Sequence, residues 1–166
     1  MPSAAITWSN PGEIMARTSQ PQFFEPSRDD AIALLERHHF GRLAFSFHDR
    51  VDIEPISYVF ADGWLYGRTS RGSKLTTVRH HPWVAFEVDE IEGQFDWRSV
   101  VVHGTLYFLD DEGGDRAAHE AYAHAVDLLR TIDAGALTSA DATPERVAVF
   151  RIYADDITVR AARTSA

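Results

Sequence analysis

The sequence predicts a mainly β protein with helices, in which six antiparallel strands close into a small barrel. From Gly41 onward, short segments rich in β-branched and aromatic residues follow one another and are separated by turn signals. Hairpin connections between successive strands favour an antiparallel sheet. Six such strands usually close into a barrel, because closure removes exposed edges.

Length and proline content divide the chain into an arm and one domain. The 166 residues are enough for one sizeable core and too few for two domains of ordinary size. Residues 1–26 contain four prolines and show no sustained period, so we expect an extended N-terminal arm. Residues 27–166 are expected to form the barrel domain.

Helical spacing of apolar residues predicts three helices, over about residues 28–38, 72–80 and 111–135. The first follows Ser27, a good N-cap residue, and repeats Ile32 and Leu35 at a spacing of three. Pro82 ends the second helix. The third is the longest and is expected to end near Gly135.

Extended segments predict the strands, at residues 41–47, 51–60, 64–70, 83–91, 97–109 and, as one or two strands, 146–160. The segment 97–109 alternates clearly between two faces. The face expected to lie in the core carries Val100, Val102, Leu106 and Phe108. The other face is amphipathic and available for contacts, and it carries Trp97, Ser99, His103 and Tyr107.

Composition excludes several classes of function. The chain has no cysteine, which removes disulfides, thiolate metal sites and thiol nucleophiles, so any redox chemistry must come from a cofactor. A net charge of -9 argues against general nucleic-acid binding. No apolar run approaches the roughly 20 residues needed to cross a membrane, and the N-terminus lacks the features of a signal peptide. We therefore expect a cytoplasmic protein.

A basic loop, TSRGSK at residues 69–74, follows the third predicted strand. Its hydroxyls, its glycine and the charge of Lys74 suit the binding of a phosphate group, although a solvated basic turn is an equal alternative on composition alone. The loop does not match the Walker A pattern, and no GxGxxG occurs. HEAYAH, at residues 119–124, misses the HExxH zinc pattern by one residue, so no metal site is expected.

The ordered motifs from EPISYVFADGWLYGRTSRGSKL through HPWVAFEV to WRSVVVHG resemble the pyridoxamine 5'-phosphate oxidase-like flavoproteins, in particular the nitroimidazole-resistance-like branch. The resemblance runs from about Leu34 to Asp110 and more weakly to the final strand. It implies a split β-barrel that binds FMN along the second and third strands of the barrel. It also implies a homodimer with the cofactor at the interface.

Carried over to this chain, the resemblance implies ten cofactor-binding residues. The backbone that faces the isoalloxazine ring would be that of Pro55, Ile56, Ser57 and Tyr58. Ribityl or phosphate oxygens would be contacted by Arg68, Thr69, Ser70 and Lys74. Trp97 and Ser99 resemble residues that reach the site from the partner subunit. One departure is Arg68, where related nitroimidazole-type proteins often have histidine.

The function expected from this resemblance is an FMN-dependent oxidoreductase acting on an unidentified small molecule, with no identified catalytic side chain. A non-catalytic flavin or haem carrier or sensor is the alternative from another class, with His103 a candidate axial ligand for haem. The deazaflavin F420 ranks below FMN, because its longer acidic tail calls for more basic residues. Pyridoxamine 5'-phosphate oxidation itself is disfavoured, because the C-terminal RTSA lacks an arginine-rich substrate segment.

Overall fold

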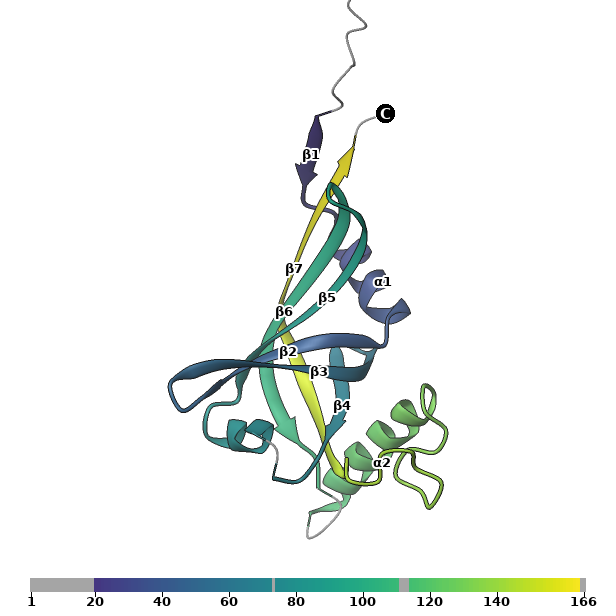
Figure 1. Cartoon of the computed structure of the whole chain (residues 1–166). Coiled ribbons are helices and arrows are strands. Elements are labelled where there is room, and N and C mark those ends of the chain that lie inside the picture. Colours follow the sequence, from purple (N-terminus) through teal and green to yellow (C-terminus); the bar gives the residue numbers. More distant parts are fainter. Residues whose placement is uncertain (1–19, 73, 111–113, 165–166) are drawn as a thin grey trace, which may run out of the picture.

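The computed structural model describes residues 20–72, 74–110 and 114–164 (Figure 1). The described residues form one antiparallel sheet of seven strands with two α-helices and a short 3₁₀ helix. In chain order the elements are β1 (Pro21–Phe24), α1 (Arg28–Arg37), β2 (Phe40–Phe47), β3 (Arg50–Ala61), β4 (Trp64–Thr69), η1 (Lys74–His80), β5 (Trp83–Gly93), β6 (Asp96–Phe108), α2 (Arg116–Arg130) and β7 (Ala148–Thr164). Neither described α-helix is long and apolar enough to cross a membrane.

The sheet closes into a ring through β7. The strand order is β1-β7-β4-β3-β2-β5-β6, and β6 pairs with β7 as well. Six strands therefore form the predicted barrel, and the fold class is confirmed. The seventh strand, β1, is absent from the sequence prediction. It pairs with the Ala161–Thr164 end of β7, which extends beyond the barrel and offers a backbone edge.

Two parts of the sheet project from the barrel (Figure 1). The β2–β3 hairpin projects to one side, and its two-residue turn at His48 and Asp49 has positive φ at both positions, as a type I′ turn requires. The ends of β5, β6 and β7 extend together past the barrel with β1, and we call this part the β extension (Figure 1). The β3–β4 turn, at Asp62 and Gly63, is also of type I′, and both turns lie between strands that the sequence predicts.

Helix α1 begins with a reciprocal capping box. The Ser27 hydroxyl accepts from the Asp30 amide at 3.1 Å, and the Asp30 carboxylate accepts from the Ser27 amide at 3.0 Å. The buried face of the helix carries Ala31, Leu34 and Leu35, which join the core of the barrel. The Tyr58 hydroxyl of β3 donates to the Leu35 carbonyl at 2.9 Å, so the last turn of the helix is fixed to the sheet.

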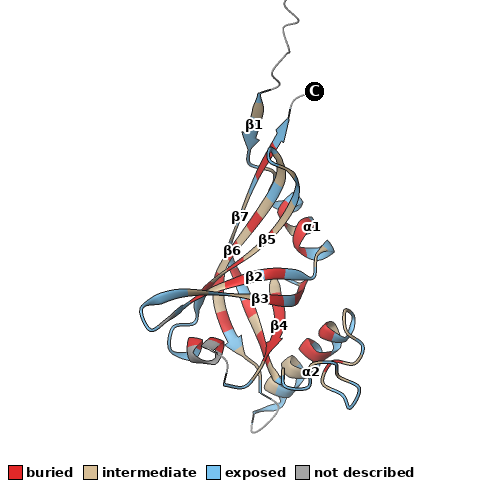
Figure 2. Cartoon of the chain, viewed as in Figure 1, coloured by how far each residue is buried: buried red, intermediate tan, exposed pale blue. Residues whose placement is uncertain are grey.

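The core fills the interior of the ring, where most buried residues lie (Figure 2). Val100 and Val102 of β6 are fully buried and Leu106 is 4% exposed, as the alternation of that segment predicts. Phe108 is partly buried against the same core. Burial of each such side chain stabilises the fold by about 1.5–3 kcal/mol.

Helix α2 differs from its predicted range. It spans Arg116–Arg130 with Asp115 as the N-cap, whereas residues 111–113 lie outside the described part of the chain. The predicted end near Gly135 is wrong, because the Thr131 hydroxyl and amide both bind the Leu128 carbonyl and tighten the last turn. Residues 131–147 then form a long connection, which we call the α2–β7 loop.

Strand β7 is one continuous element of 17 residues rather than two strands. Its pairing with β6 shifts register between His103 and Gly104. At that point the strands approach so closely that a Cβ on Gly104 would lie 1.9 Å from the Tyr153 carbonyl oxygen. Only glycine fits this position without moving the backbone of β7.

We therefore predict that G104A destabilises the fold by about 3 kcal/mol, the upper end of the usual cost of overpacking, because the clash involves the backbone of β7. The matched control is G93A, where the nearest atoms to an added Cβ are 3.9 Å away. Chemical denaturation followed by far-UV circular dichroism measures both variants. Equal stability of G104A and G93A would contradict the register described for β6 and β7.

Candidate functional site

The predicted site residues lie in two groups at opposite ends of β7. One group is on β3, β4 and the basic loop, and Thr69 of this group pairs with Ala148 at the start of β7. The other group lies on β6, where Trp97 pairs with Ala162, fourteen residues further along β7. At about 3.3 Å per residue, roughly 46 Å of strand separates them. One chain does not bring the two groups together.

The backbone of β3 offers its polar groups alternately to its two sides. The Tyr58 amide donates to the His39 carbonyl at 3.0 Å, on the β2 side. Because these groups alternate along a strand, Ile56 also faces β2, whereas Pro55 and Ser57 face away from it. Pro55 fits this pattern, because proline has no amide to donate to a ladder. Of the four predicted backbone contacts, Ser57 and Pro55 are the two directed away from β2.

On that side of β3, the sheet opens. The pairing of β3 with β4 ends at Tyr58 and Gly67, although β4 continues alongside β7 as far as Thr69. Within the described strands, Ser57 and Arg68 therefore flank the point where β3 and β4 separate. We call this opening the β3–β4 edge. It presents the Ser57 amide and the Pro55 carbonyl beside the start of the basic loop.

The basic loop leaves the sheet directly beyond this edge. Thr69 is buried, Ser70 is half-buried, and Arg71 is exposed. Gly72 has a φ of 83°, which favours glycine, so the loop turns sharply before η1. Ser73 and the side chain of Lys74 lie outside the described part of the structure. The phosphate contacts predicted for this loop stay a prediction.

Arg68 has a role that its sequence context does not reveal. Its side chain is 9% exposed, and its guanidinium donates to both carboxylate oxygens of Asp141 and, at 2.8 Å, to Asp133. It also donates to the Thr143 hydroxyl at 3.1 Å. The guanidinium holds the pKa of the Asp141 carboxyl well below its usual range. The predicted contact of Arg68 with a cofactor stays a prediction, but its described partners all belong to the α2–β7 loop.

Asp141 organises the same loop from within. Its carboxylate is 2% exposed and accepts the amides of Leu137 at 2.7 Å and Thr143 at 2.8 Å in addition to Arg68. Loss of one partner of such a buried pair typically costs about 3–5 kcal/mol. Arg68 and Asp141 therefore fix the α2–β7 loop against β4.

A cavity of about 200 Å³ lies between this loop and the β3–β4 edge. Its lining residues come from β3, β4, α2 and the loop, and they are Ser57, Arg68, Leu129, Ile132, Asp133, Ala142, Thr143 and Arg146. The structure therefore brings together two predicted residues, Ser57 and Arg68. It adds Arg146, which the sequence analysis does not identify, because no local motif links it to β3.

The second group lies in a groove of about 520 Å³ on the β extension. Alternate residues of β6 line it, namely Trp97, Ser99, Val101 and His103, and we call it the Trp97 groove. The Ser99 hydroxyl donates to the Glu87 carboxylate at 2.9 Å. The Phe23 ring of β1 lies 6.4 Å from the Trp97 ring, so the short edge strand helps to hold the indole.

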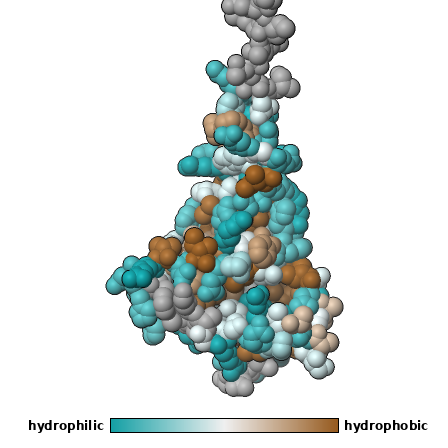
Figure 3. All heavy atoms as spheres, viewed as in Figure 1, coloured by the Kyte–Doolittle hydropathy of each residue, from teal (hydrophilic) through white to brown (hydrophobic). Residues whose placement is uncertain are grey.

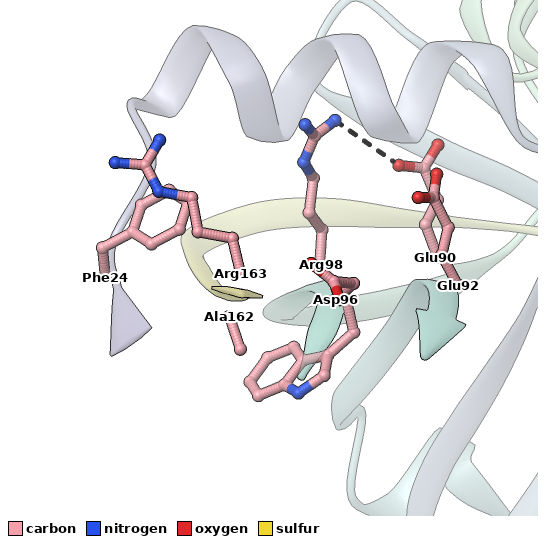
Figure 4. Close-up of a pocket in the computed structure, with 8 residues that line it drawn as sticks. Phe24, Glu90, Glu92, Asp96, Arg98, Ala162 and Arg163 are labelled. Atoms are coloured by element: carbon pink, nitrogen blue, oxygen red, sulfur yellow. Dashed lines mark ion pairs between the residues drawn. The ribbon is translucent and has the colours of Figure 1, made fainter. Parts of the chain in front are cut away.

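A smaller cavity of about 160 Å³ adjoins Trp97 at the end of the β extension (Figure 4). Arg98 points across it toward Glu90, at 3.7 Å. Glu90 also accepts from Arg37 of α1 and from His38, the C-cap of that helix, both at 2.7 Å. The Arg37 hydrogen bond, with that of His38, lowers the pKa of Glu90 to about 2. This cluster joins the end of α1 to the β extension.

Metal ligands do not gather in the part of the chain that the structure describes. No group of three or more histidine, aspartate or glutamate side chains there is arranged to hold a metal ion. His119 and His124 lie on α2, where His119 Nδ1 contacts the Asp115 carbonyl at 2.8 Å and His124 packs against the ring of Tyr66.

Comparisons with known proteins agree with this architecture. A family model described as pyridoxamine 5'-phosphate oxidase matches residues 27–161. An uncharacterised protein of Rhizobium meliloti (strain 1021) is 30% identical over 103 residues, which cover 62% of this chain and 66% of that protein, just under two thirds of its length.

Solved structures share the fold. A FAD-binding protein of Mesorhizobium loti is 26% identical, with 83% of this chain and 96% of that chain covered and a TM-score of 0.65. The FAD-binding protein of Mycobacterium smegmatis is 24% identical, with 84% of this chain and 98% of that chain covered and a TM-score of 0.60. A protein of Bacteroides thetaiotaomicron named for 5-nitroimidazole antibiotic resistance is 13% identical, with 85% and 88% covered and a TM-score of 0.64.

The ring of six antiparallel strands and these structural matches define a split-barrel protein. The family model covers the barrel from the cap of α1 to Ala161 in β7. The chain therefore belongs to the pyridoxamine 5'-phosphate oxidase family, in agreement with the ordered motifs of its sequence.

The hydrogen bonds and ion pairs that Glu90 forms with Arg37, His38 and Arg98 lead us to predict a loss of stability at acid pH. A carboxyl whose pKa is lowered by folding stabilises the protein above its unfolded pKa, and this contribution is lost as the pH falls from about 4.5 to about 2. We expect E90Q to be less stable than the parent by roughly 1 kcal/mol at pH 7, after solvent screening. The difference should shrink steadily below about pH 4.5 and be small at pH 2.

Thermal unfolding of E90Q between pH 2 and 7 measures this effect. The control is E92Q, which removes an exposed carboxylate of the same strand. A stability difference between E90Q and the parent that stays constant across this pH range would contradict the role assigned to Glu90.

Proposed function

We propose that the chain is a homodimeric flavoprotein oxidoreductase that binds FMN between the β3–β4 edge of one subunit and the Trp97 groove of its partner. The observation that carries the proposal is the separation of the predicted site residues to opposite ends of β7. Each end holds part of a site, and a two-fold axis is the simplest operation that joins two unlike ends of identical chains.

The residues at the β3–β4 edge fit the chemistry of a flavin phosphate. The Ser57 amide and the Pro55 carbonyl offer a donor and an acceptor to the polar edge of a ring. The basic loop beyond them suits an anionic tail. When bound, a flavin supplies electron or hydride transfer, and the protein supplies its orientation and the exclusion of water. Trp97 supplies an aromatic surface and Ser99 a hydroxyl from the partner side.

The relatives support a flavin rather than an unrelated ligand. The Mesorhizobium loti protein, 26% identical to this chain, is named as FAD-binding. We favour FMN for this chain because, apart from Arg68, which is paired with Asp133 and Asp141, the described basic residues at this end of the β4–β7 ladder are Arg71 and Arg146, enough for one phosphate group. Comparison of FMN with FAD in the same titration separates the two cofactors.

Exposed apolar residues support the homodimer. Val51 and Ile53 are 78% and 60% exposed and share the outer face of β3 with Pro55 and Ser57. Figure 3 shows hydrophobic atoms at the surface around the projecting β2–β3 hairpin. An exposed apolar row beside half of a binding site is the composition expected of a surface that a second subunit covers.

The first prediction of this proposal is flavin binding. Purified protein should carry flavin absorbance, or should gain about 2.7 kcal/mol of stability in FMN at one hundred times its Kd. FAD should stabilise it less at equal concentration. Anaerobic reduction by NADH or NADPH followed by turnover of a quinone identifies an oxidoreductase, and reduction without turnover identifies a carrier. Absence of both absorbance and stabilisation rejects the proposal.

The second prediction tests the shared site. S57P removes the outward amide of β3, and W97A removes the aromatic surface of the groove, so each homodimer should lose flavin affinity. An equal mixture of S57P and W97A, dissociated and reassociated, should recover about a quarter of the binding sites. About half of the dimers then contain one subunit of each variant, and one of the two sites in such a dimer has both an unchanged β3–β4 edge and an unchanged Trp97 groove. The control is S57A, which keeps the amide. No recovery in the mixture contradicts a site built from two subunits.

A further inference from the structure

Arg146 is one of the residues that line the cavity beside the β3–β4 edge. It lies two residues before β7, is half-buried, and lines the cavity with Ser57 and Arg68. Its amide donates to the Thr143 carbonyl at 2.9 Å, and its own carbonyl accepts from Arg68 at 3.4 Å. Both ends of its peptide backbone are therefore held by the same network that fixes the α2–β7 loop.

The strand register also brings Arg146 close to the basic loop. Thr69 pairs with Ala148 where β4 and β7 end their ladder. Arg71 follows Thr69 by two residues, and Arg146 precedes Ala148 by two residues, so the two arginines leave the ladder from the same end. The predicted phosphate loop, residues 69–74, and the end of the α2–β7 loop are therefore neighbours.

The charges in this region leave Arg146 available, among the described residues, to bind an anion. The guanidinium of Arg68 forms ion pairs with Asp141 and Asp133. Asp133 also lines the cavity, but its carboxylate is already paired with Arg68. No hydrogen bond or ion pair joins the Arg146 guanidinium to another described residue. A half-buried guanidinium without a carboxylate partner, next to a basic loop, is suited to an anionic ligand.

We propose that Arg146 binds the phosphate group of the flavin and that Arg68 is its positioning residue. This inference rests on the proposed function and assigns the anion site to a residue outside the basic loop. Arg68 acts through the Arg146 carbonyl and through Asp141, which fix the backbone from which Arg146 reaches the ligand.

The decisive experiment compares FMN with riboflavin, which has the same ring and ribityl chain but no phosphate. Quenching of flavin fluorescence gives the Kd of each for the full-length protein. We expect R146Q to weaken FMN binding by about tenfold or more and to change riboflavin binding by less than about twofold, because only FMN offers the charged partner. R146K should recover part of the FMN affinity.

The matched control is R116Q, which removes an equal charge from an arginine that is 92% exposed on α2. It should change neither Kd, so a general electrostatic effect is separated from a direct contact. Equal weakening of FMN and riboflavin by R146Q would overturn the inference, as would failure of both R146Q and R146K to fold.

The positioning role is tested by R68K, which keeps the charge but not the forked geometry. We expect weaker FMN binding with riboflavin binding nearly unchanged, and no further loss when R68K is combined with R146Q. A purely structural Arg68 would lower the affinity for both flavins alike. If the parent protein binds neither flavin, the proposed function fails. If the parent protein binds FMN more tightly than riboflavin and R146Q keeps the same ratio of the two Kd values, only the present inference fails.

Discussion

Backbone pairing along β7 is the constraint on which the rest of the structure depends. The strand closes the barrel by pairing with β4 on one side and β6 on the other, and its far end also holds β1. Because strand geometry fixes the rise per residue, β7 also sets the distance between the two predicted half-sites. The register shift at Gly104 is part of the same constraint, since the close approach to Tyr153 determines how the β extension continues from the barrel.

Arg68 holds the α2–β7 loop beside the barrel, and the cavity lies between that loop and the β3–β4 edge. A buried guanidinium requires compensation, and two carboxylates of the α2–β7 loop provide it. The loop is thereby held beside the β3–β4 edge, although loops of this length are otherwise the least constrained part of a fold. The charge of Arg68 is largely neutralised in doing so. A phosphate at this edge would then depend on other cations, and the two arginines at the end of the β4–β7 ladder are suitably located.

The sequence predicted most of the barrel because its signals are local. Alternation placed Val100 and Val102 in the core, and turn signals separated the predicted strands on either side of Asp62 and Gly63. Strand β1 gave no such signal, because its four residues are ordered by the distant end of β7. The partners of Arg68 were equally hidden, since Asp133 and Asp141 are 65 and 73 residues away in the chain. Arg146 has no motif around it, and only the β4–β7 register brings it near the basic loop.

The arrangement of the two half-sites follows from the same physics. The ring opens where β3 leaves β4, and an opened sheet exposes backbone groups that need partners. At the other end, Trp97 lines a groove on the β extension, which projects beyond the barrel (Figure 1). Each region lacks what the other supplies: one has polar backbone and positive charge, and the other has an aromatic surface. Within a chain, the single strand β7 connects the two half-sites. Association of two copies would therefore set the geometry of both binding sites at once, and neither binding site would require a loop to close over the ligand.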